Sequence, residues 1–201
     1  MMMLDEFNRS LFPLINGPAE PGAAMLLLAR GCAALLVLAV PLYLLLAWLR
    51  GGEGRRAPLL EAALACALGF ALSAALGALW PQPRPFMVPL GHALMPHAAT
   101  PSFPSNHLTG IWSVAFSLLL HGKQRRAGLW LALLGLPVAW ARIYLGIHFP
   151  LDMVGAALVA AASAAVLHLV LPGLVSLLLP PVNAVYRWIF APLIRRGWVA
   201  W

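Results

Sequence analysis

Long, continuous apolar runs rich in leucine and alanine constrain this fold more than any other feature of the sequence. A helix of about 20 apolar residues spans a bilayer, whereas the strands of a transmembrane barrel alternate over about ten residues. Only 9% of the 201 residues are charged, against roughly 25% in a soluble domain. We therefore expect one all-α integral membrane domain over residues 1–201, with about five transmembrane helices. The expected spans are residues 24–49, 59–80, 105–121, 128–145 and 150–171.

Two amphipathic segments flank these spans. Residues 4–15 mix apolar and charged side chains and contain Pro13. Residues 182–196 mix aromatic side chains with arginines. Helices of this composition lie in the membrane interface, so we expect an interfacial helix near each terminus. A short sixth span is the alternative for residues 182–196.

Basic residues gather on one side of the expected spans. The loops 50–58 and 121–127 and the C-terminal segment hold Arg50, Arg55, Arg56, Lys123, Arg125, Arg126, Arg187, Arg195 and Arg196. The other side holds Arg9, Arg30, Arg84 and Arg142. Cytoplasmic loops carry an excess of Lys and Arg, so we expect the first side to face the cytoplasm. The net charge of +7 then reflects topology and anionic membrane lipids, not nucleic-acid binding.

Three polar clusters stand at the outer ends of the apolar runs, at residues 83–86, 104–107 and 141–152. The first and third contain Arg84 and Arg142, although an arginine at the bilayer centre costs about 2.5–3.5 kcal/mol on insertion scales and less near an interface. A guanidinium binds phosphate bidentately and keeps its charge. The pair therefore predicts a phosphate site, with snorkelling to the interface as the alternative.

The other polar residues of these clusters fit phosphoryl transfer. Ser105 fits the N-cap of a helix, whose free N–H groups near Asn106 would bind an anion, and His107 follows. His148 and Asp152 are four residues apart, so the carboxylate can fix the imidazole tautomer and leave one nitrogen free to attack. A purely structural His–Asp pair is the alternative. These histidines and Asp152 also have metal-ligand chemistry, but two adjacent arginines would repel a dication, so we expect no metal and no cofactor.

The order and spacing of these clusters resemble the three signature motifs of the type-2 phosphatidic acid phosphatase (PAP2) superfamily. The resemblance covers about residues 80–155 and includes the Arg-x5-His-x3-Asp spacing of Arg142, His148 and Asp152. The segments 83–86, 102–105 and 144–152 look most like the bacterial undecaprenyl-pyrophosphate phosphatase branch associated with bacitracin resistance.

The resemblance implies a role for each motif residue. His148 would attack the terminal phosphorus and form a phosphohistidine, and Asp152 would orient it. His107 would protonate the leaving phosphate and then activate water. The phosphate oxygens would be held by Arg84, Ser105, Asn106 and Arg142.

The chain departs from the superfamily pattern in its first motif. The superfamily has a lysine seven residues before its arginine, where this chain has Gly77. The phosphate pocket therefore has one positive charge fewer than is usual. Gln82 and His97 are candidates to contribute in its place, with ordinary loop residues as the alternative.

The expected activity is hydrolysis of undecaprenyl diphosphate to undecaprenyl phosphate, which recycles the lipid carrier of cell-wall synthesis. The resemblance places this enzyme in the bacterial inner membrane with its active site facing the periplasm or cell exterior. The alternatives are a phosphatase of phosphatidate, phosphatidylglycerophosphate or lipid A, and a membrane protein that binds or transports lipid without chemistry. The oligomeric state is left open by the sequence.

Overall fold

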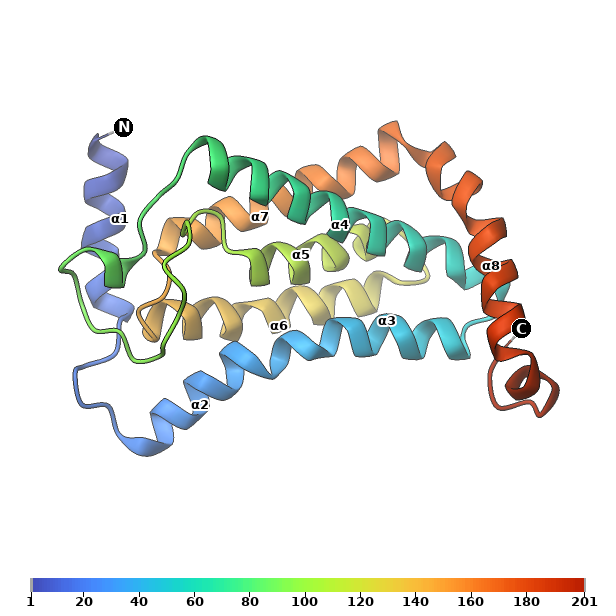
Figure 1. The fold of residues 1–201 in the computed structure, drawn as a ribbon, viewed down its shortest axis with the longest axis horizontal. Coiled ribbons are helices and arrows are strands. Elements are labelled where there is room, and N and C mark those ends of the chain that lie inside the picture. The colour runs from blue at the N-terminus through green and yellow to red at the C-terminus, as the bar shows by residue number, and fades with distance from the viewer. Residues whose placement is uncertain (1, 201) are drawn as a thin grey trace.

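The computed structural model describes residues 2–200, which form helices joined by loops, with no strand among them (Figure 1). Eight α-helices follow one another along the chain. They are α1 (Met2–Ile15), α2 (Ala23–Ala34), α3 (Ala39–Arg50), α4 (Arg56–Leu79), α5 (Asn106–Leu119), α6 (Arg125–Tyr144), α7 (Pro150–Ala165) and α8 (Pro172–Arg195). Three 3₁₀ turns, η1 (Leu36–Leu38), η2 (Glu53–Arg55) and η3 (Pro85–Met87), and one π-helical turn, η4 (Val166–Val170), complete the architecture.

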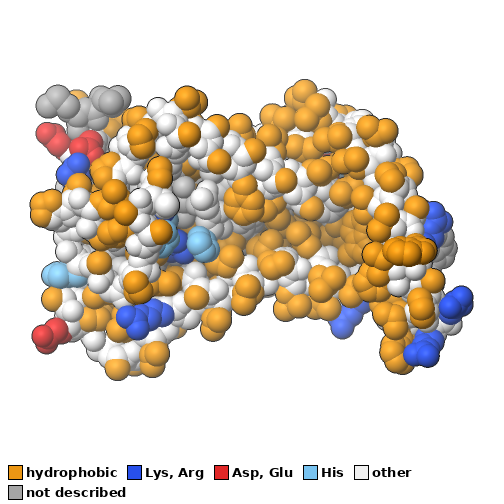
Figure 2. All heavy atoms as spheres, in the orientation of Figure 1, with side chains coloured by type: hydrophobic (Ala, Val, Ile, Leu, Met, Phe, Trp, Pro, Cys, Tyr) orange, Lys and Arg blue, Asp and Glu red, His pale blue; other side chains and the backbone are white. Residues whose placement is uncertain are grey.

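Five helical segments are long and apolar enough to cross a membrane, which confirms the expected all-α membrane fold. They are Ala23–Arg50, Glu53–Leu79, Arg125–Tyr144, Pro150–Val170 and Pro172–Arg195. The first joins α2, η1 and α3 into one long helix, and the fourth joins α7 to η4. Apolar side chains cover most of the bundle surface, as a lipid-facing surface requires (Figure 2).

The structure differs from the sequence prediction at residues 105–121, which were expected to form a full span. Helix α5 has 14 residues and is therefore about 21 Å long, shorter than the roughly 30 Å hydrocarbon core. It lies inside the bundle and packs on α4, α6 and α7. Its polar residues Thr109, Ser113 and Ser117 are completely buried, so α5 faces protein where the other helices face lipid.

The C-terminal segment also differs from its expected boundaries. The expected interfacial helix, residues 182–196, is the second half of the continuous helix α8. This helix runs across one end of the bundle, and α1 runs across the other (Figure 1). The fully buried Arg56 fastens α8 to α4: its Nη1 donates to Asn183 Oδ1 at 3.2 Å, and its guanidinium stacks on the Tyr186 ring at 4.1 Å.

The two ends of the bundle carry different kinds of side chain. Figure 2 shows Lys and Arg side chains at both ends, but most of the basic residues belong to the end that carries α8: Arg50, Arg55, Arg56, Lys123, Arg125, Arg126, Arg187, Arg195 and Arg196. At the other end, the loop 80–105 folds over the start of α5, and α1 closes the bundle with Phe12, whose ring meets that of Phe149 at 5.3 Å. Asn8 on α1 accepts a hydrogen bond from Leu151 N at 2.9 Å and so caps the start of α7. The three predicted polar clusters all lie at this end.

Candidate active site

A helix-ending turn after α6 positions the third cluster. Gly146 has a φ of 76°, a left-handed conformation that glycine adopts without strain. Gly146 N donates to Ile143 O at 3.0 Å and Ile147 N donates to Arg142 O at 3.2 Å, the two bonds of a Schellman motif. This turn ends α6 just after Arg142 and leads the chain directly to His148 and the start of α7.

Asp152 holds the His148 ring from the first turn of α7. Asp152 Oδ2 lies 3.0 Å from His148 Nδ1, and both side chains are buried. The same oxygen accepts from Phe149 N at 2.8 Å and from Ser102 Oγ. Pro150 occupies the first helical position, where its missing N–H costs nothing. One carboxylate oxygen therefore caps the helix and fixes the imidazole together.

The other ring nitrogen of His148 identifies its tautomer. Arg84 Nη1 lies 3.1 Å from His148 Nε2. A guanidinium only donates hydrogen bonds, so Nε2 accepts here and the ring proton lies on Nδ1, facing Asp152. Burial lowers the pKa of His148 to about 4, against the opposing effect of Asp152. The imidazole is therefore neutral at physiological pH, with an unprotonated Nε2 facing the first cluster.

Arg84 has a protein partner for each of its five N–H groups. Nε donates to Thr100 O at 2.9 Å, and Nη2 donates to Thr100 Oγ1 and Pro101 O, each at 3.1 Å. Nη1 contacts Ile147 O at 2.9 Å as well as His148 Nε2. Burial lowers the pKa of this guanidinium, but arginine stays charged in proteins. Arg84 thus links the loop 80–105 to the histidine, and would have to exchange one of these bonds to reach a phosphate oxygen.

Arg142 and Ser105 each carry a buried polar atom that has no protein hydrogen-bond partner. Among the described residues, Arg142 Nε and Ser105 Oγ are buried without a hydrogen bond. Ser105 does occupy the N-cap position of α5, but its hydroxyl makes no capping bond. Leaving such a donor unpaired costs about 1–3 kcal/mol, more for a charged group. Two such donors beside His148 and Arg84 form a site that an anion would complete.

His107 and Asn106 form the exposed rim of the site. Both are exposed at the start of α5, but partial burial of the His107 imidazole, together with the positive charges of Arg142 and Arg84, lowers its pKa to about 4. Both residues also line an apolar pocket of about 430 Å³ between α3, α4 and α5. A ligand with a charged head and an apolar tail would therefore meet His107 where its two parts join.

His97 and Gln82, the two additional candidates, lie differently. The His97 ring is edge-on to that of His148, with centroids 6.4 Å apart. Its Nδ1 donates to Ala98 O at 3.0 Å, and its Nε2 faces Arg142 Nη2 at 3.5 Å. Burial also lowers its pKa. Gln82 contacts the site through its backbone carbonyl, which accepts a hydrogen bond from Ser102 N at 2.8 Å.

Thr100 and Ser102 belong to the site, although no role for them was derived from the sequence. Thr100 accepts two bonds from Arg84, and Ser102 donates to Asp152. Both are small polar residues in a long loop, and a loop of this length inside a compact domain is usually functional. That loop was the available signal; the particular contacts arise only from its folded path.

Known proteins resemble this chain over much of its length. The sequence pattern of the PAP2 superfamily matches residues 58–175. YbjG of Escherichia coli (strain K12), assigned by name to the undecaprenyl-diphosphatases, is 36% identical over 98% of this chain and 99% of its own length. The undecaprenyl-diphosphatase BcrC of Bacillus subtilis (strain 168) is 31% identical over 76% of this chain and 78% of its own. The crystal structure of Aquifex aeolicus LpxE matches with a TM-score of 0.64 and 27% identity, over 78% of this chain and 92% of that one.

Proposed function

This chain belongs to the PAP2 superfamily, and we propose that it hydrolyses undecaprenyl diphosphate to undecaprenyl phosphate and inorganic phosphate. The observation that carries the proposal is the neutral His148, whose free Nε2 faces Arg84 beside the unpartnered donors of Arg142 and Ser105. The names of its relatives YbjG and BcrC support the choice of substrate.

The first chemical step is attack by His148. Its Nε2 forms a bond to the terminal phosphorus while the bond from that phosphorus to the bridging oxygen breaks. The negative charge of the bound diphosphate stabilises the protonated form of His107, which then donates its proton to the departing oxygen, and that oxygen leaves on undecaprenyl phosphate. The Nδ1 proton stays between His148 and Asp152, whose negative charge stabilises the positive charge that develops on the ring.

The second step returns the enzyme to its starting state. His107, now neutral, takes a proton from a water molecule as that water attacks the phosphorus. The P–N bond breaks, inorganic phosphate leaves, and His148 regains its free Nε2. Only positioning, charge and proton transfer are required of the protein, as is usual for phosphoryl transfer.

Fixed donors stabilise the charge on the transferred group. Arg142 Nε and Ser105 Oγ are already unpartnered, so they bind phosphate oxygens without breaking protein contacts. The N–H groups at the start of α5, near Asn106, add the positive end of a helix dipole. Arg84 exchanges its contact with His148 Nε2 for a phosphate oxygen when that nitrogen attacks. Donors held in place before the reaction need little reorganisation during it.

The apolar pocket beside His107 receives the start of the lipid tail. Its walls are Val37, Val40, Pro41, Leu44, Cys66, Phe70, Gly110 and Ile111. At about 430 Å³ it holds only the part of an undecaprenyl chain nearest the diphosphate. The rest of the chain lies in the bilayer.

We place the active site at the outer face of the bacterial inner membrane. The support is that most of the Lys and Arg residues belong to the loops and helix ends at the opposite end of the bundle, which fits the excess of basic residues in cytoplasmic loops. There the enzyme acts on the diphosphate that is released on the outer face and recycles the carrier lipid. Other lipid phosphates, such as phosphatidate, phosphatidylglycerophosphate or lipid A, are the alternative substrates.

Phosphate release from detergent-purified protein tests the proposal. Native protein and His148→Ala are assayed in parallel with undecaprenyl diphosphate and with phosphatidate, with EDTA present. We expect EDTA-insensitive release from undecaprenyl diphosphate that is lost in the variant. Faster release from phosphatidate would indicate that the substrate is another lipid phosphate and not undecaprenyl diphosphate. No release from native protein with either lipid would favour a binding or transport protein.

A further inference from the structure

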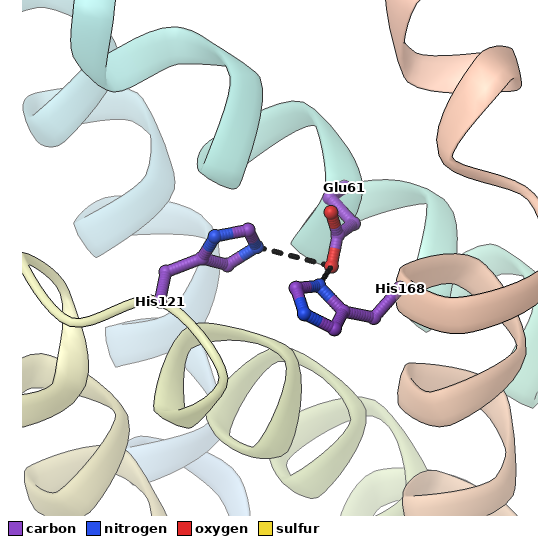
Figure 3. Close-up of side chains that lie close together, drawn as sticks. All are labelled: Glu61, His121 and His168. Carbon is purple, nitrogen blue, oxygen red and sulfur yellow. Dashed lines mark hydrogen bonds and ion pairs between the residues drawn. The ribbon is translucent and has the colours of Figure 1, made fainter.

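A second cluster of ionisable side chains lies at the basic end of the bundle, apart from the active site. It contains Glu61 on α4, His121 just after α5, and His168 in the π-helical turn η4 (Figure 3). Glu61 Oε1 lies 3.0 Å from His121 Nε2 and 3.0 Å from His168 Nδ1. Dashed lines in Figure 3 join one nitrogen of each ring to this one carboxylate oxygen. None of the three residues takes part in the proposed phosphatase chemistry.

The placement of Glu61 calls for a compensating positive charge. Its side chain is 8% exposed and lies within the span Glu53–Leu79. A buried carboxylate is costly unless it is paired or binds a metal, and an ionisable residue in such a span suggests a functional site. Arg56, the nearest arginine on the same helix, is occupied by Asn183 and the Tyr186 ring. The two imidazoles carry a full positive charge only when protonated.

The contact between His121 and Glu61 is close but is not a hydrogen bond. His121 Nε2 is buried and has no hydrogen-bond partner among the described residues, although Glu61 Oε1 is 3.0 Å away. Its ring nitrogen is therefore not aligned with that oxygen. Two ligands of one metal ion also lie close together without a hydrogen bond between them, because their lone pairs point at the ion and not at each other.

The distances fit a tetrahedral ion. With metal–ligand bonds of about 2.0–2.1 Å, the ligand atoms of tetrahedral zinc are about 3.3 Å apart. Here two of the three separations are 3.0 Å, and all three ligand atoms lie within 4.8 Å of one another. Two histidines and one glutamate form a known zinc ligand set that leaves a fourth position open. The side chains of His168 and His121 are 33% and 21% exposed, so solvent borders the cluster.

The π-helical turn explains how His168 reaches the cluster. In η4, Leu171 N donates to Val166 O at 3.0 Å, five residues back, so the helix widens for one turn. Such π-bulges occur frequently at functional sites. The three ligands come from segments that are far apart in the chain, so an ion bound by them would fasten α4, the α5–α6 turn and the end of α7 together.

We propose that Glu61, His121 and His168 bind one zinc-class divalent cation at the end of the bundle opposite the active site. Binding replaces the proton on His168 Nδ1, whose ring then carries its proton on Nε2, and water occupies the fourth position. The ion neutralises the buried carboxylate and joins three segments of the bundle. This proposal departs from the expectation of a chain without metal, which rested on the repulsion by Arg84 and Arg142 at the other end.

Cobalt spectroscopy and metal analysis test the site on the full chain. The protein is purified without a polyhistidine tag, stripped with EDTA and titrated with Co²⁺, whose visible bands are strong in tetrahedral sites and weak in octahedral ones. Zinc retained after desalting is measured by mass spectrometry. We expect about one equivalent of zinc and a saturable tetrahedral cobalt spectrum. Both should be lost in Glu61→Gln and in His168→Ala.

His92→Ala is the matched control, because it removes an exposed histidine at the other end and should leave metal binding unchanged. Zinc should also raise the melting temperature of native protein saturably, which tests the site even where a variant folds poorly. Zinc retention equal in native protein and Glu61→Gln, or a purely octahedral cobalt spectrum, would overturn the proposal. Phosphate release is expected to survive metal removal, so failure of the metal site leaves the phosphatase proposal standing.

Discussion

Replacing Asp152 with asparagine separates the charge of this residue from its hydrogen bonding. In the structure, Asp152 Oδ2 accepts from His148 Nδ1, Phe149 N and Ser102 Oγ. The amide of Asp152→Asn can place its oxygen at the same position and keep all three bonds. The substitution therefore removes a negative charge beside the ring while the packing is preserved.

The size of the effect follows from the distance between the two groups. Asp152 Oδ2 lies 3.0 Å from His148 Nδ1. At an effective dielectric constant of about 20, two unit charges about 3 Å apart interact by roughly 5.5 kcal/mol. If about half a charge has developed on the ring in the transition state, roughly 3 kcal/mol of stabilisation is lost. That corresponds to a decrease in kcat of about 100-fold.

Steady-state phosphate release from undecaprenyl diphosphate measures this decrease. The melting temperature and elution volume of Asp152→Asn should stay close to native values, which establishes that the variant is folded. A kcat within threefold of native in a folded variant would refute the reasoning, because Asp152 would then only cap α7.

Three other changes test separate parts of the site. Ser105→Ala removes a buried hydroxyl that has no protein partner. We expect kcat/KM to fall about 10–100-fold and the melting temperature to stay unchanged or rise. A lower melting temperature would show that Ser105 has a structural role instead. Burial lowers the pKa of His148 to about 4, so between pH 6.5 and pH 4 the unfolded chain binds a proton that the folded chain does not. Stability should fall by up to about 3 kcal/mol as the pH falls through this range, and His148→Gln should flatten that part of the curve of melting temperature against pH; identical curves would contradict the assignment. Val37→Trp fills the apolar pocket and should lower kcat/KM severalfold for undecaprenyl diphosphate but not for a short soluble diphosphate. The control is Leu38→Trp, because the Leu38 side chain is 58% exposed; this variant should leave kcat/KM unchanged for both substrates.

The sequence was sufficient to predict the membrane fold, because apolar length and low charge leave few alternatives. It also placed the three polar clusters at one end of the bundle, since their positions at the ends of successive spans determine their side of the membrane. Helix α5 was expected to be longer because its apolar run resembles the others. Burial by α4, α6 and α7, which hydropathy does not report, allows a shorter helix there.

Contacts made by loops, and contacts between residues far apart in the chain, could not be predicted from the sequence. Thr100 and Ser102 bind Arg84 and Asp152 only through the folded path of the loop 80–105. Glu61 and His168 are 107 residues apart in the chain, and they meet because α4 and η4 pack together. A carboxylate within an apolar span was the visible signal for that second cluster, but its partners depend on tertiary structure.

Detection of the covalent intermediate tests the central claim most directly. Native protein is mixed with undecaprenyl diphosphate labelled in its terminal phosphate, quenched under alkaline conditions that preserve phosphohistidine, and digested for mass spectrometry. The mechanism predicts one labelled peptide, phosphorylated at His148, which appears before free phosphate and is absent from His148→Ala. Label on another residue, or turnover without any labelled protein, would contradict the claim that His148 is the nucleophile.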